Sequence, residues 1–122
     1  MEENVDKFDL REAKKLKDEA NNIIKANGNV DEALDLYKKA IDLCPPYETS
    51  EKAIFHNNMG LTLKKIKKIP EAKIEFEKSM ELNPNYVKPL YNRMLILKDQ
   101  KQYDEAFEDT QKILSIDPSF QR

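Results

Sequence analysis

Glycine, cysteine and tryptophan are scarce in this chain of 122 residues, which contains two glycines, one cysteine and no tryptophan. Two glycines are too few for a glycine-rich phosphate-binding loop or for many tight hairpin turns. The lone cysteine, Cys44, excludes an intramolecular disulfide and a metal site built from a cysteine cluster. We therefore expect no metal and no cofactor. The composition suits a reducing compartment, most simply the cytoplasm.

Long apolar runs are also missing, and the charges nearly balance. No stretch approaches the roughly 20 apolar residues that a membrane-spanning helix needs, and residues 1–10 lack the apolar core of a signal peptide. Lys plus Arg is 21 and Asp plus Glu is 23, which gives a net charge of -2 and argues against a nucleic-acid binder that is basic overall. We expect neither nucleic acid nor membrane among the partners. Hydrophobic residues make up 39%, enough for one modest core.

A repeated unit organises the sequence. Three tripeptides ending in alanine each open an apolar run: Asp31-Glu32-Ala33, Pro70-Glu71-Ala72 and Asp104-Glu105-Ala106. These runs end in Pro45, Pro84 and Pro118. The second and third alanines are 34 residues apart and the first and second 39, so five extra residues fall in the polar stretch 45–51. We expect a single domain, 1–122, with repeats at about 13–46, 53–86 and 87–120.

Each repeat contains two helical patterns, with apolar residues at i, i+3, i+4 and i+7 and no alternating strand pattern. The first helices are expected over 16–26, 53–66 and 87–99, with Gly28 ending the first of them. One small alanine on each second helix lets its partner helix approach closely. Because no helix pair covers its own apolar face, the pairs must stack. The predicted fold class is all-α: three tandem helix–turn–helix repeats forming a right-handed α-solenoid, with the first helices lining a concave face.

With these repeats the chain resembles the tetratricopeptide-repeat (TPR) family, whose 34-residue unit carries small and large apolar residues at set places and a proline at its end. The resemblance covers about 16–118. The small residue of the first helix is Ala20 in repeat 1 and Gly60 in repeat 2, but Met94 in repeat 3. The resemblance implies the TPR superhelix and a role in protein binding.

Charge is distributed unevenly between the two kinds of helix. The first helices of repeats 2 and 3 contain lysine and arginine and no acid over 53–66 and 87–98, whereas the second helices are rich in aspartate and glutamate. We therefore expect a basic concave groove and an acidic outer face, which together favour an acidic peptide as the ligand. The alternative is an ordinary solvated surface that happens to be rich in lysine.

Some TPR proteins bind the acidic C-terminus of a chaperone, Hsp70 or Hsp90, through a five-residue carboxylate clamp. By this resemblance the peptide-binding residues are Lys17, Asn21, Asn58, Lys88 and Asn92. Lysine supplies charge and asparagine a directed N–H donor to the two carboxylates of the peptide, one on its last side chain and one at its end. The fifth position is arginine in the family and Asn92 here, and the neighbouring Arg93 points about 100° away on a helix. Alternatively, the asparagines are ordinary polar surface.

We expect a non-enzymatic protein-interaction module with a co-chaperone or adaptor role. Two alternatives are an assembly scaffold that binds through other surfaces without a working clamp, and the targeting domain of a larger enzyme. His56 and Cys44 occupy apolar positions, where packing explains them better than catalysis. Repeat arrays normally end in a polar cap, so we expect the uncapped third repeat to self-associate through 103–122.

Overall fold

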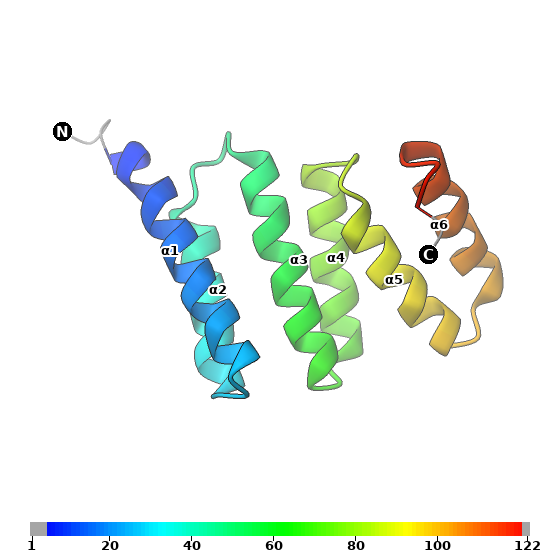
Figure 1. Cartoon of the computed structure of the whole chain (residues 1–122), viewed down its shortest axis with the longest axis horizontal. Helices are drawn as coiled ribbons and strands as arrows, with labels where there is room; N and C mark the ends of the chain where they lie inside the picture. The colour runs from blue at the N-terminus through cyan, green and yellow to red at the C-terminus, as the bar shows by residue number, and fades with distance from the viewer. Residues whose placement is uncertain (1–4, 121–122) are drawn as a thin grey trace.

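The structure, a computed structural model, describes residues 5–120 and forms six α-helices over that range (Figure 1). In chain order they are α1 (Val5–Lys25), α2 (Val30–Leu43), α3 (Thr49–Lys65), α4 (Ile69–Leu82), α5 (Val87–Asp99) and α6 (Tyr103–Ile116). No strand occurs in 5–120, and the predicted all-α class is confirmed. Residues 1–4 and 121–122, which the expected domain 1–122 includes, lie outside the described residues. The same holds for the end of the expected self-association surface at 103–122.

The helices stack as three pairs, α1 with α2, α3 with α4 and α5 with α6, running from left to right in Figure 1. Between pairs, α2 contacts α3 and α4 contacts α5. The first helices also contact one another, α1 with α3 and α3 with α5, whereas within 5–120 the backbones of α2, α4 and α6 stay apart. A stack whose first helices touch while its second helices diverge is curved, with the first helices on the inner face. The right-handed α-solenoid of three repeats is therefore confirmed.

Within this range no helix is both long and apolar enough to cross a membrane.

The core is continuous across the pairs because small residues alternate with aromatic ones. Ala33 and Ala72, the alanines that open the second helices of repeats 1 and 2, are fully buried. The rings of Tyr37 and Phe76 lie one turn further along the same helices and belong to the same cluster. This cluster extends from α1 to Ile96 on α5, so the repeats share one hydrophobic core.

Two expected helix boundaries are wrong. The first helix begins at Val5, about three turns before the expected residue 16, because Leu10 and Ala13 pack in a second cluster with Phe55. The third helix begins at Thr49 and not at 53. Part of the extra stretch 45–51 is therefore one more helical turn, and the link between the first two repeats is shorter than its sequence suggests.

The turn within each repeat uses one left-handed residue, and the expectation that Gly28 ends the first helix is wrong in detail. The left-handed φ belongs to Asn27 (57°), and its equivalents are Lys67 (68°) and Lys101 (64°). The N–H of Gly28 then donates to the carbonyl of Ile23 at 2.8 Å, as in a Schellman motif. The same bond closes the other two turns, so each second helix leaves its first helix in the same way.

We predict that Gly60→Ala destabilises the protein. In an ordinary exposed helix this change stabilises by up to about 1 kcal/mol. Here the added Cβ would lie 2.6 Å from Cε1 of Phe76, a ring that is 0% exposed. We expect a loss of about 1–3 kcal/mol in the free energy of unfolding, measured by urea denaturation. Phe76→Leu in the same chain should relieve part of the clash, so the double variant should lose less stability than the sum of the two single losses. Losses that simply add would contradict this explanation.

Candidate functional site

A cavity of about 290 Å³ lies where α1, α2 and α3 meet. Its lining includes Asn21 from α1 and Asn58 from α3, two of the five predicted peptide-binding residues. These side chains come from different repeats, and the stacking of the first helices brings them to one space. The cavity therefore offers two amide groups, which can donate N–H bonds to an anion without adding charge.

The rest of the lining contains the hydroxyl side chains of Tyr37 and Thr62, two aliphatic residues and two lysines, and no acidic residue. Ile24 and Leu61 contribute aliphatic surface, and Lys25 and Lys65 are exposed beside them. Coulomb attraction at such a surface favours a ligand with negative charge, and the aliphatic surface favours an apolar group next to it.

Tyr37 on α2 connects the cavity to the core. Its side chain is 2% exposed, and its hydroxyl donates a hydrogen bond to Oδ1 of Asn21. Burial raises the pKa of Tyr37, and a hydrogen bond with Thr62 partly opposes that rise. The phenol therefore stays protonated at neutral pH and remains a donor. The hydroxyl of Thr62 in turn donates to the backbone carbonyl of Asn58 at 3.0 Å.

The two predicted lysines are placed differently. Nζ of Lys17 lies 3.0 Å from Oδ1 of Asp18, and most of the Lys17 side chain is covered. Lys88 is exposed on the first turn of α5. Lys88 is thus open to solvent, whereas Lys17 already has an acidic neighbour.

Asn92, the fifth predicted residue, is only 9% exposed. Its Nδ2 donates to Oδ1 of Asn57 at 3.0 Å and so ties α5 to α3. Burial raises the pKa of Tyr86, opposed by its hydrogen bond with the same Asn57. Asn57 was not among the predicted residues. The one feature of the sequence that could have pointed to it is its place directly before Asn58. Neighbouring residues on a helix point about 100° apart, so Asn57 faces a neighbouring helix when Asn58 faces the cavity.

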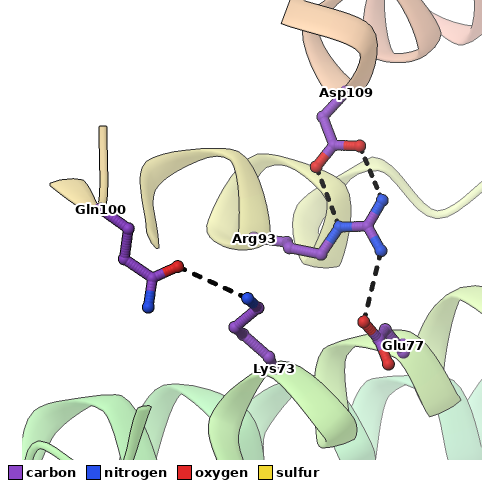
Figure 2. Close-up of polar contacts among 5 residues, drawn as sticks. All are labelled: Lys73, Glu77, Arg93, Gln100 and Asp109. Carbon is purple, nitrogen blue, oxygen red and sulfur yellow. Dashed lines mark hydrogen bonds and ion pairs between the residues drawn. The ribbon is translucent and has the colours of Figure 1, made fainter. Parts of the chain in front are cut away.

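Arg93 faces the second helices (Figure 2). Its guanidinium donates two bonds to Asp109 of α6, at 2.9 and 2.7 Å, and lies 3.5 Å from a carboxylate oxygen of Glu77 on α4. The hydrogen bond with Asp109 raises the pKa of Arg93 although burial opposes that rise. Arg93 therefore joins three helices.

His56 is buried, as its packing position predicted, and also forms a hydrogen bond. Its Nδ1 lies 2.7 Å from Oε1 of Glu75 and joins α3 to α4. Burial on its own would raise the pKa of the Glu75 carboxyl, but the hydrogen bond and charge of His56, together with Lys78, bring it below the ordinary value. The pair lines a second cavity of about 280 Å³ with Lys38 and Lys78.

Comparison with known proteins identifies the family. The tetratricopeptide repeat model matches residues 53–86 and 88–120, which is more than half of the chain. The chain belongs to the tetratricopeptide repeat family. Domains of this family are protein-interaction modules.

The relatives are larger proteins. Mitochondrial import receptor subunit TOM70 of Rattus norvegicus is 29% identical over 108 residues, which cover 88% of this chain and 18% of that protein. Protein unc-45 homolog B of Danio rerio is 27% identical over 110 residues, 90% of this chain and 12% of that protein. The chain thus spans less than a fifth of the length of either relative.

The fold also matches a solved complex. This structure is the first TPR of Spaghetti (RPAP3) bound to the HSP90 peptide SRMEEVD, with a TM-score of 0.77. The two chains are 24% identical, and the match covers 90% of this chain and 82% of the other. At this identity the likeness supports the fold.

We predict that Arg93→Ala destabilises the protein by about 3–5 kcal/mol, because it leaves the carboxylate of Asp109, a residue 3% exposed, buried without its partner. Lys98→Ala on the same helix is the control and should change the free energy of unfolding by less than about 0.5 kcal/mol. The double variant with Asp109→Ala should be more stable than Arg93→Ala alone. A double variant that is less stable would contradict the assigned role of this pair.

We also predict a specific acid dependence. Because the folded pKa of Glu75 is below its ordinary value of 4.5, its ionised form stabilises the fold above pH 4.5. That contribution is lost as the pH falls from 4.5 through the lower folded value. Glu75→Gln should therefore flatten this part of the profile of unfolding free energy against pH. Glu71→Gln, an exposed control on the same helix, should keep a steeper dependence on pH than Glu75→Gln does. Equal profiles for the two variants would contradict the prediction.

Proposed function

We propose that this chain is a non-enzymatic interaction module that binds the acidic, extended C-terminus of a partner protein on its inner face, in a cytoplasmic co-chaperone or adaptor role. The observation that carries the proposal is the cavity that Asn21 and Asn58 share. Two amides from successive repeats, with lysines beside them and no acid in the lining, suit a carboxylate.

The proposed class of partner rests on the likeness of this chain to solved TPR complexes. The first and second TPR domains of Spaghetti (RPAP3) are each described as bound to the HSP90 peptide SRMEEVD. By that likeness we propose the C-terminal peptide of an Hsp70 or Hsp90 chaperone as the ligand. Within the family we infer the nearest likeness to tetratricopeptide repeat protein 1, from segments 43–45, 53–58 and 103–109.

The proposed site is a modified clamp. Asn21 and Asn58 supply N–H donors, Lys17 and Lys88 supply charge, and Asn92 stands at the fifth position with its Nδ2 already donated to Asn57. A charge-assisted hydrogen bond is worth about 1.5–3 kcal/mol, so the missing arginine costs roughly tenfold to a hundredfold in affinity. We therefore propose binding in the micromolar range or weaker.

A second candidate is an assembly scaffold that binds through α6. Tyr103 and Phe107 are 60% and 61% exposed and lie one turn apart on this helix. Beyond α6, Phe120 folds back onto Tyr91 with ring centroids 5.4 Å apart and leaves those two rings uncovered. Exposed aromatic side chains are typical of contact surfaces, and a second copy of the chain is the partner we expect there. Sedimentation with and without Phe107→Lys tests this expectation.

We predict that a peptide ending in Glu-Glu-Val-Asp binds with a Kd in the micromolar range or above, measured by calorimetric titration. An amide at its C-terminus should remove most of the binding, and added salt should weaken it because exposed charges are screened. Asn21→Ala and Asn58→Ala should each weaken binding. Asn22→Ala, an exposed amide next to Asn21, is the matched control. Equal affinity for free acid and amide would overturn the proposed function.

A further inference from the structure

The orientation of the Asn21 amide is fixed from another helix. The hydroxyl of Tyr37 on α2 donates to Oδ1 of Asn21. Since Oδ1 is engaged, the polar group that Asn21 has left for a ligand is Nδ2, with its N–H donors. If the amide turned over, its oxygen would face the ligand and repel a carboxylate. The tyrosine hydroxyl therefore makes this side of the cavity a donor.

Packing alone does not require that hydroxyl. Tyr37 and Phe76 each lie four residues after the buried alanine of their helix, and both rings are buried in the same cluster. Phenylalanine thus suffices at the equivalent place in repeat 2. In repeat 1 the added oxygen finds Asn21, in the lining of a cavity. Of these two positions, only the one in repeat 1 therefore gives the second helix a polar side-chain atom at the cavity.

The α5 side of the groove offers fewer donors. Nδ2 of Asn92 donates to Asn57, and the guanidinium of Arg93 is held by Asp109 and Glu77. Lys88 is exposed there and supplies charge. The directed donors of the predicted clamp that face a cavity thus lie on α1 and α3.

We propose that this cavity binds a single carboxylate, the one at the end of the peptide chain, on an Asn21 amide that Tyr37 orients. The ligands of this chain are then peptides with a free C-terminus whose last side chain need not be acidic. Tyr37 acts as a positioning residue for Asn21. This inference rests on the proposed terminal-carboxylate binding and states which of the two carboxylates of the peptide is recognised.

A set of four peptides tests the ligand class on the unmodified protein. The peptides end in Glu-Glu-Val-Asp or Glu-Glu-Val-Ala, each as a free acid and as an amide. We expect the change from Asp to Ala to weaken binding of the free acid less than threefold and amidation to weaken it at least tenfold. If the change from Asp to Ala costs as much as amidation, two carboxylates are bound and the inference is wrong. If acid and amide bind equally, the proposed function itself fails, which is a distinguishable result.

Tyr37→Phe tests the positioning role. We expect it to weaken binding of the free acid about three- to tenfold, the value of one neutral hydrogen bond, and to leave binding of the amide unchanged. Tyr47→Phe, which removes an exposed hydroxyl in the link between α2 and α3, is the control and should change neither. A Tyr37→Phe variant that binds both peptides less well to the same degree, or that binds the free acid as tightly as the unmodified protein, would overturn the positioning role.

Asn21→Asp provides a second test that does not depend on the stability of the tyrosine variant. The new carboxylate still accepts the hydrogen bond of Tyr37 but presents an oxygen to the ligand in place of an N–H donor. We expect at least a tenfold loss for the free acid and less than a threefold loss for the amide. Unchanged binding of the free acid would show that Asn21 does not face the ligand.

Discussion

Each helix pair in this chain leaves one apolar side uncovered, and the rest of the structure follows from the need to cover it with the next pair. Residues of all three repeats are buried in one cluster, which includes Tyr37 of α2, Phe76 of α4 and Ile96 of α5. Close packing limits the size of the side chains on α3, and between Gly60 and the ring of Phe76 there is no room for even one more carbon. Stacking in turn sets the inner face, because it brings α1, α3 and α5 together.

Polar residues set the relative positions of the stacked helices. An apolar surface tolerates sliding, whereas the hydrogen bond between Asn57 and Asn92 and the two bonds between Arg93 and Asp109 form at one alignment only. Both contacts join α5 to its neighbours. Asn92 and Arg93, at and beside the predicted fifth clamp position, therefore place the third repeat.

Periodicity predicted most of the fold, because alanine and proline recur at the same places in each repeat and the helix pattern between them is unambiguous. It failed at the start of α1, where Leu10 and Ala13 extend the helix by packing in the cluster of Phe55, and at the start of α3. It also took Gly28 as the end of the first helix, although the left-handed residue that ends it is Asn27 and its equivalents in the other repeats are lysines. Only part of the candidate site could be predicted from the sequence. Spacing within one helix relates Lys17 to Asn21, but no local pattern shows that Tyr37 bonds to Asn21 or that Asn92 bonds to Asn57.

The buried cysteine gives the first repeat a built-in chemical reporter. Cys44 lies at the end of α2 among Ala13, Ala40 and Phe55, and burial raises the pKa of its thiol to about 11. The thiolate that reacts with alkylating reagents is thus scarce while α1 covers it. Because the chain has one cysteine, all labelling comes from this position. The labelling rate then measures how frequently α1 separates from the helices behind it, and a ligand that bridges α1 and α3 slows that rate by holding the first repeat closed.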